Sequence, residues 1–142
     1  MFRTLDDTIM VAGQVNPADI AEAAALGVTF VINNRPDEEQ PGQPAGSEIE
    51  AAAKKAGLGY AAIPITHAGF SMNQVEAMRA ALEAAPGKVL AFCRSGTRST
   101  LVWALARATM GDAPDALAAK AEAAGYDLSP IRASLDTLAA QG

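Results

Sequence analysis

The sequence predicts a three-layer α/β fold, in which a mainly parallel central sheet of about four to five strands is flanked by helices. Strand-like apolar runs alternate with helical stretches along the chain, and single helices between strands imply right-handed crossovers and parallel pairing. The length of 142 residues suits one domain with one core, so we treat 1–142 as a single domain. Half of the residues are hydrophobic, and many of these are alanine, which suits closely packed helices on a few richer strands.

The first elements are a short strand, a helix and a buried strand. An apolar run at 8–11 predicts the first strand. Asn16 and Pro17 are typical of a helix N-cap and first helical position, and they open a helix that reaches Leu26 before a glycine. The run VTFVIN at 28–33 is nearly all apolar and β-branched, as expected for a strand buried on both faces.

A loop rich in proline and glycine covers 34–46 and precedes the second helix. Ser47 with Glu50 has the spacing of a capping box, which predicts a helix that ends at Gly57. A further strand is expected at 60–63.

The third helix follows a second loop, at 64–70. Ser71 with Gln74 again has the capping-box spacing, and the helix should run to about Ala85. The run KVLAF at 88–92 predicts the last strand.

The C-terminal part is helical. After the last strand comes a long helix to Met110 that is apolar on nearly every side, so we expect it to be central and buried, with Trp103 in the core. Two further helices are expected at about 114–124 and 130–140.

Composition excludes several classes of function. The chain has 11 Lys and Arg against 16 Asp and Glu, and this net charge of −5 without a basic run disfavours binding to nucleic acid or an anionic membrane. No stretch reaches the ~18 apolar residues of a membrane span, and the polar segment 1–7 lacks a signal-peptide pattern, so a cytoplasmic location is expected. One cysteine and one histidine exclude an internal disulfide and a Cys/His metal cluster, and we expect no metal or other cofactor.

Three loops should meet beyond the carboxyl ends of the parallel strands, where such sheets bind ligands: 34–46, 64–70 and 93–98. The last of these joins a buried strand directly to a helix. Such a turn aims successive backbone N–H groups at one point, where the helix dipole also favours negative charge.

Cys93 lies at the base of this predicted cradle, and its thiolate form should be favoured there. Ser95, Gly96 and Thr97 keep the turn small and supply backbone N–H groups. The alternative is that Cys93 is only a small buried hydrophobe at a strand end. Two arginines beside it are poor core material and favour a nucleophilic cysteine.

The arginines of the loop supply charge for an anionic substrate. Arg98 offers a planar fork to an oxyanion, and Arg94 adds a second positive charge. Ser99 is placed to give the sulfur a hydroxyl hydrogen bond. We therefore expect Cys93, Arg98 and Ser99 to be catalytic, with Arg94 and the small residues of the loop binding substrate.

The segment Cys-Arg-Ser-Gly-Thr-Arg-Ser at 93–99 resembles two families. Protein tyrosine and dual-specificity phosphatases carry Cys-x-x-Gly-x-x-Arg-Ser, with five residues between cysteine and arginine. Rhodanese-type sulfurtransferases often carry Cys-Arg-x-Gly-x-Arg, with four. Here four residues separate Cys93 from Arg98, so the loop has the rhodanese length.

The rest of the chain, over roughly 1–110, resembles dual-specificity-phosphatase-like domains. The resemblance rests on Gly13-Gln14 through Asp19 and on the run from Leu26-Gly27-Val28 into VINNRPDEE. It is closest to the phosphatase-like domain of beta-lactamase-hydrolase-like proteins, a family also described as sulfur transferases. Members occur alone or fused to persulfide dioxygenases of the metallo-beta-lactamase fold, which implies a functional link to such an enzyme.

Two observations separate phosphoester cleavage from sulfur transfer. Phosphatases of this fold take a general acid Asp from the loop after the third strand, and here 64–70 has no carboxylate. His67 is either a substitute acid or an ordinary loop histidine. The shorter loop also draws the ring of N–H donors inward, which suits a single persulfide sulfur better than a phosphoryl group.

The loop at 34–46 carries further charged candidates. Arg35 either supports the cradle and contacts substrate or fixes its own loop through Asp37. The paired acids Glu38 and Glu39 are expected to be solvated.

The residues favour a cysteine-dependent sulfurtransferase with a Cys93 persulfide intermediate. Its partners would be thiosulfate or a small persulfide as anionic donor and an external thiol as acceptor, because the chain has no second cysteine. The alternative is a phosphatase with a Cys93 phosphocysteine intermediate, and a third possibility is a non-catalytic module that binds an anion or a partner.

Overall fold

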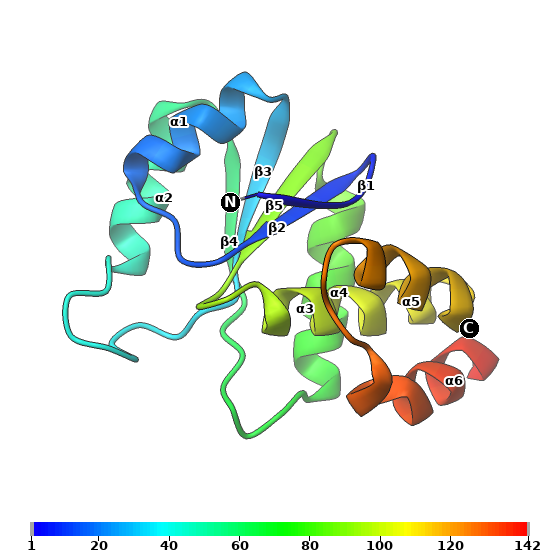
Figure 1. The fold of residues 1–142 in the computed structure, drawn as a ribbon. Helices are drawn as coiled ribbons and strands as arrows, with labels where there is room; N and C mark the ends of the chain where they lie inside the picture. The colour runs from blue at the N-terminus through cyan, green and yellow to red at the C-terminus, as the bar shows by residue number, and fades with distance from the viewer. Residues whose placement is uncertain (1, 142) are drawn as a thin grey trace.

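The central sheet of the computed structural model, which describes residues 2–141, has five strands in the order β1-β2-β5-β3-β4 (Figure 1). All neighbouring strands are parallel except the hairpin of β1 and β2. The strands are β1 Arg3–Asp6, β2 Ile9–Ala12, β3 Val28–Asn33, β4 Gly59–Ala62 and β5 Lys88–Phe92. The predicted three-layer architecture is confirmed.

Helices cover both faces of the sheet (Figure 1). Their bounds are α1 Pro17–Ala25, α2 Gly46–Lys55, α3 Met72–Ala84, α4 Thr97–Thr109, α5 Pro114–Ala123, the short 3-10 helix η1 Ser129–Ile131 and α6 Arg132–Gln141. α1 and α2 pack on one face, and α3 to α6 pack on the other. Strand β5 feeds both layers: Val89 and Ala91 join the core under α3 and α4, while Leu90 and Phe92 join the core under α1 and α2.

The two central strands have the bounds that the sequence predicts, 28–33 and 88–92. The prediction missed β1 and placed the first strand one residue early, since β2 is Ile9–Ala12. β1 reads Arg-Thr-Leu-Asp and buries only Leu5 fully, so this edge strand carries little of the apolar signal that marks the others. The strand expected at 60–63 is shifted by one residue as well.

Two of the three predicted helix caps are present. Asn16 with Asp19, and Ser71 with Gln74, form reciprocal capping boxes. The box expected from Ser47 and Glu50 is wrong: α2 begins at Gly46, its N-cap residue makes no side-chain cap, and the Gly46 N–H donates to Asp37 Oδ1 at 2.8 Å instead. A carboxylate nine positions earlier in the chain thus replaces the local serine.

α4 is the buried central helix that its composition predicts. Nine of its residues are buried, among them Trp103 at 1% exposure, and it packs between α3 and α6. The last helix starts later than expected, because Ser129–Ile131 forms a 3-10 turn before Arg132. None of the helices formed within residues 2–141 is long and apolar enough to cross a membrane.

Candidate active site

Cys93 lies at the carboxyl end of β5, in the middle of the parallel part of the sheet. Its N–H donates to the Ala12 carbonyl at 3.3 Å, and the neighbouring Asn34 N–H donates to the Phe92 carbonyl at 2.8 Å. These bonds tie the loop after β5 to the ends of β2 and β3. The loops at 34–46 and 93–98 therefore meet here with the end of β2, and the loop at 64–70 joins them because the Ile65 N–H donates to the Asn34 carbonyl at 2.9 Å.

The loop after Cys93 forms a turn around the sulfur. Gly96 is the N-cap of α4 and has a φ of 89°, in the left-handed region that glycine tolerates. Its N–H donates to Cys93 Sγ at 3.1 Å. Among the described residues no side chain caps α4, so its first N–H groups, which have no partner inside the helix, are available to an anion. Cys93 itself is fully buried.

Glu39 and the Ile65 carbonyl accept hydrogen bonds from one edge of the Arg98 guanidinium. Nη1 donates to Glu39 Oε2 at 2.7 Å and to the Ile65 carbonyl at 2.6 Å, and Nη2 donates to Glu39 Oε1 at 2.9 Å. These bonds use three of the five N–H groups of arginine and leave the Nε–H and one Nη2–H on the other edge. The hydrogen bonds to Glu39 raise the pKa of Arg98, and the nearby Cys93 sulfur acts in the same direction. Arg98 is thus a fixed cation, and no group within residues 2–141 makes a hydrogen bond with its other two donors, which an anion could take.

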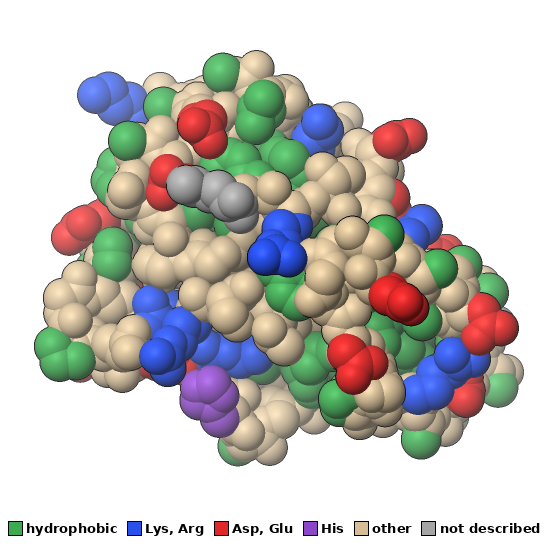
Figure 2. All heavy atoms as spheres, viewed as in Figure 1, with side chains coloured by type: hydrophobic (Ala, Val, Ile, Leu, Met, Phe, Trp, Pro, Cys, Tyr) green, Lys and Arg blue, Asp and Glu red, His purple; other side chains and the backbone are tan. Residues whose placement is uncertain are grey.

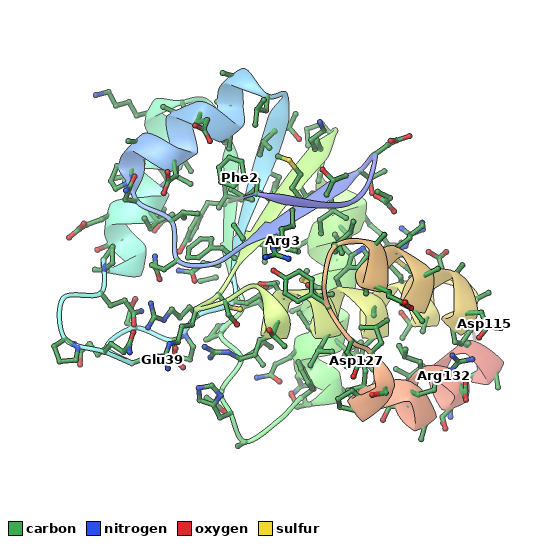
Figure 3. The ribbon with its side chains drawn as sticks, in the orientation of Figure 1. Phe2, Arg3, Glu39, Asp115, Asp127 and Arg132 are labelled. Atoms are coloured by element: carbon green, nitrogen blue, oxygen red, sulfur yellow. The ribbon has the colours of Figure 1, made fainter. Side chains whose placement is uncertain are left out.

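Glu39, on the loop after β3, was predicted to be solvated, and this prediction is wrong because its carboxylate binds Arg98 (Figure 3). Its side chain is 17% exposed rather than solvated, and it accepts from Arg98 and from Arg35 Nε at 2.9 Å. Hydrogen bonds from Arg98, with Arg35 adding to them, lower the pKa of Glu39 to about 2. Of the two alternatives for Arg35, the fixing of its loop through Asp37 is wrong, because Arg35 binds Glu39 and Asp37 caps α2.

Ser99 does not bind the sulfur as expected. Its Oγ donates to Asn34 Oδ1 at 2.7 Å, and both residues are fully buried. Asn34 also donates through Nδ2 to the Ile63 carbonyl at 3.0 Å. The single hydroxyl proton of Ser99 therefore satisfies a buried amide oxygen, and the pair ties α4 to the ends of β3 and β4.

The remaining predicted residues surround this centre. His67 is 76% exposed, and its Nε2 lies 3.9 Å from Glu39 Oε2. Figure 2 shows the histidine beside a group of basic side chains. Arg94 is exposed, Ser95 Oγ donates to Thr97 Oγ1 at 3.1 Å, and Arg35 is 4% exposed.

Two contacting residues were missed by the sequence analysis. Gln14, after β2, accepts from Arg35 Nη1 at 3.0 Å and donates its backbone N–H to the Arg94 carbonyl at 3.3 Å. Tyr126, after α5, donates its hydroxyl to the Ser95 carbonyl at 3.0 Å. The position of Gln14 just after a parallel strand was a usable signal, whereas nothing in the local sequence marks Tyr126.

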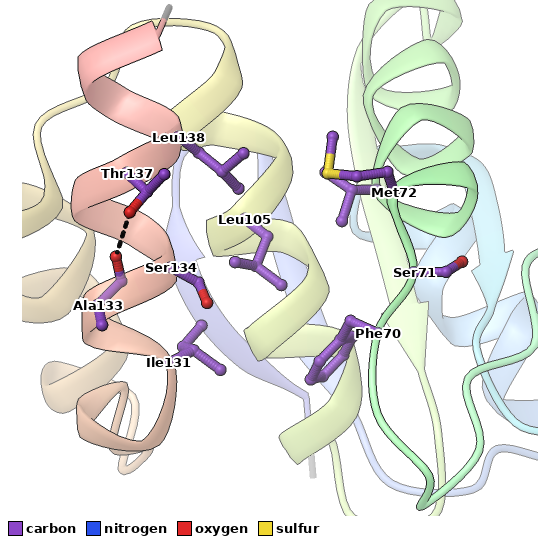
Figure 4. A pocket seen from close by; sticks show the side chains of 10 residues that line it. Phe70, Ser71, Met72, Leu105, Ile131, Ala133, Ser134, Thr137 and Leu138 are labelled. Atoms are coloured by element: carbon purple, nitrogen blue, oxygen red, sulfur yellow. Dashed lines mark hydrogen bonds between the residues drawn. The ribbon is translucent and has the colours of Figure 1, made fainter.

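An apolar pocket of about 510 Å³ lies farther along α4, between the start of α3 and α6 (Figure 4). Phe70, Met72, Leu105 and Leu138 are among the residues that line it. Leu105 is seven residues after Arg98, about 10 Å along the helix, and no residue of 93–99 lines this pocket. We therefore regard it as separate from the cysteine site.

Comparison with known proteins agrees with this geometry. The family model described as "Beta-lactamase hydrolase-like protein, phosphatase-like domain" matches residues 1–110. A Beta-lactamase hydrolase-like protein of Xylella fastidiosa is 33% identical over 125 residues, which is 87% of this chain and 29% of that protein. The chain thus spans less than a third of the length of this relative.

Solved structures share the fold over nearly the whole chain. A candidate phosphatase of Neisseria meningitidis is 35% identical, covers 96% of each chain and has a TM-score of 0.82. Tk-PTP in its active form is 19% identical, covers 99% of this chain and 97% of its own, and has a TM-score of 0.77, which shows a shared fold. The family model and the Neisseria meningitidis structure agree better with the phosphatase alternative than with the sulfurtransferase that the loop length favoured.

Proposed function

Because this chain belongs to the family of the phosphatase-like domain of beta-lactamase hydrolase-like proteins, we propose that it is a cysteine-dependent phosphatase of small phosphomonoesters. One arrangement carries the proposal: the Cys93 sulfur accepts the Gly96 N–H at 3.1 Å, and Arg98 leaves one edge of its guanidinium free beside it. This arrangement combines a nucleophile with fixed donors for the oxygens of a phosphoryl group.

The proposed reaction has two steps. The Cys93 thiolate attacks phosphorus, an S–P bond forms, and the P–O ester bond breaks as the leaving oxygen departs with the electron pair and takes up a proton. Water then attacks the phosphocysteine, the S–P bond breaks, and inorganic phosphate leaves while the thiolate is restored. Arg98 and the first N–H groups of α4 stabilise the equatorial oxygens in both steps.

The source of the leaving-group proton limits the substrate. Glu39 is ionised at neutral pH, since its pKa is about 2, and the loop 64–70 has no carboxylate. His67 is the titratable group left at the rim, and its ring is exposed. General acid catalysis is worth about 10²–10⁴-fold, so a site without a carboxylic acid on this loop should prefer aryl esters, whose leaving groups need little protonation, over alkyl esters.

Sulfur transfer is the second candidate, and the spacing of four residues between Cys93 and Arg98 favours it. In that reaction the thiolate attacks the outer sulfur of thiosulfate, the S–S bond breaks and sulfite leaves with the electron pair. The resulting Cys93 persulfide then passes its outer sulfur to an external thiol, because the chain has one cysteine.

One experiment separates the two. The protein and a Cys93→Ser variant are incubated with an aryl phosphate, an alkyl phosphate or thiosulfate, and phosphate release and intact mass are measured. We expect aryl phosphate turnover that is lost in Cys93→Ser, slower alkyl turnover and no gain of sulfur. A gain of one sulfur atom on Cys93 without phosphate release overturns the phosphatase in favour of sulfur transfer. No reaction with any of them overturns both and leaves an anion-binding module.

A further inference from the structure

The peptide that joins Ser95 to Gly96 has a hydrogen bond at each end. Its N–H, on Gly96, donates to Cys93 Sγ at 3.1 Å, and its C=O, on Ser95, accepts from the Tyr126 hydroxyl at 3.0 Å. A trans peptide is planar and its N–H and C=O point in opposite directions. The Tyr126 hydroxyl, which holds the C=O, therefore also fixes the direction in which the Gly96 N–H points.

From this shared peptide we infer that Tyr126 is a positioning residue, which holds the Ser95–Gly96 N–H on the Cys93 sulfur and so stabilises the thiolate. The inference rests on the proposed role of Cys93 as a nucleophile. It does not depend on whether the group transferred is phosphoryl or sulfur.

The orientation of the Ser95–Gly96 peptide depends on an outside hydrogen bond, because glycine itself does not restrict the rotation of this peptide. Gly96 has a φ of 89°, and a rotation of the preceding peptide by about half a turn carries it to a negative φ that glycine adopts equally well. In that second orientation the Ser95 carbonyl oxygen, instead of an N–H, faces the sulfur. A carbonyl dipole in that place repels both the thiolate and an incoming anion.

Tyr126 is itself held in place. The guanidinium of Arg3, on β1, lies 5.6 Å from the centre of its ring, and Arg3 Nη1 donates to the Ala124 carbonyl at 2.8 Å (Figure 3). The Tyr126 N–H donates to the Ala121 carbonyl at 2.9 Å at the end of α5. The ring also packs against the core, and this burial raises the pKa of Tyr126, so the hydroxyl keeps its proton at neutral pH.

The close packing around Gly96 also supports a positioning role for Tyr126. A Cβ on Gly96 would run into the Tyr126 hydroxyl and would also approach the Ala12 carbonyl at 3.4 Å. The tyrosine thus lies directly against the turn that carries the N–H. The family model matches residues 1–110, which include the cysteine loop, so Tyr126 is a residue of the site that lies outside the matched part.

The test compares Tyr126→Phe with Tyr60→Phe, which removes the hydroxyl of the other tyrosine in the chain. Tyr60 Oη accepts from Asn33 Nδ2 and donates to the Gly46 carbonyl, and within residues 2–141 it makes no hydrogen bond to the loop after Cys93. Alkylation of Cys93 by iodoacetamide is followed by intact mass from acid to mildly basic pH. The midpoint of the rate profile reports how readily the thiolate forms, whereas the plateau reports access to the buried sulfur.

We expect the midpoint to move up by about half to one pH unit in Tyr126→Phe and to stay at the wild-type value in Tyr60→Phe. The rate below the midpoint should fall about fivefold. A midpoint that is unchanged in Tyr126→Phe, or that moves equally in both variants, overturns the inference. Because alkylation needs no substrate turnover, the assay stands whether or not the protein hydrolyses phosphoesters.

Discussion

Glu39→Gln removes the charge that holds Arg98, and we expect it to lower both stability and activity. Glu39 accepts three hydrogen bonds, two from Arg98 and one from Arg35, whose side chains are only 9% and 3% exposed. Glutamine has the same shape but one acceptor oxygen in place of two. Without the carboxylate, two nearly buried guanidinium groups lose their counter-charge.

The size of the effect follows from the pKa of Glu39, which is about 2 instead of 4.5. This difference corresponds to at most about 3 kcal/mol, and solvent at the open side of the cluster reduces the expected loss to about 1–2 kcal/mol. A loss of that size lowers the melting temperature by about 3–8 °C in a domain of this length. Because Arg98 is no longer fixed by one edge, kcat/KM for an aryl phosphate should fall about 10- to 100-fold.

Glu38→Gln is the matched control. Glu38 is the adjacent residue, carries the same charge and is exposed, and no ion pair involves it among the residues that the structure describes. Thermal melts and initial rates are measured for both variants. Equal melting temperatures and rates in the two variants would contradict this role of Glu39. Higher activity of Glu39→Gln than of the wild type would contradict it too, since Glu39 would then compete with substrate for Arg98 instead of positioning it.

Two further predictions concern the same region. The depressed pKa of Glu39 contributes stability that is complete above about pH 4.5 and is lost as the pH falls towards about 2; urea midpoints measured against pH should show this loss in the wild type and a smaller one in Glu39→Gln. Ser99→Ala leaves the buried Asn34 Oδ1 without its donor and should cost about 1–3 kcal/mol by urea unfolding, while the pH profile of Cys93 alkylation stays at its wild-type position. A displaced alkylation profile would show instead that the Ser99 hydroxyl does act on the sulfur.

The elements that the sequence predicted well are those set by local signals. The strands at 28–33 and 88–92 are apolar on both faces, and the Asn16 and Ser71 capping boxes use partners three residues away. The position of Cys93 also follows from local sequence, because the apolar run of the strand ends just before it and the helix begins a few residues after it.

The contacts that complete the site depend on residues far apart in the chain. Glu39 and Arg98 are 59 positions apart, and the loop after β3 has no periodicity to indicate which of two adjacent acids turns inward. Ser99 was expected to donate to the Cys93 sulfur six residues before it in the chain, and only the folded arrangement brings Asn34, 65 positions away, close enough to take its proton. Tyr126 and Ser95 are 31 positions apart and meet because the segment after α5 lies against the loop after Cys93, a contact that no local pattern specifies.

The short loop and the position of Glu39 have a common physical consequence. Gly96 lies three residues after Cys93, as in the longer tyrosine-phosphatase pattern, so the missing residue falls between Gly96 and Arg98, in the first turn of α4. Each residue of an α-helix turns about 100° and rises about 1.5 Å, so the omission redirects the arginine around the helix axis. In this chain the redirected guanidinium meets the Ile65 carbonyl and Glu39, which fix one edge and leave the other to the anion. A loop of rhodanese length is therefore compatible with binding a phosphoryl group, provided that Glu39 holds the arginine, and the loss of activity in Glu39→Gln measures that dependence.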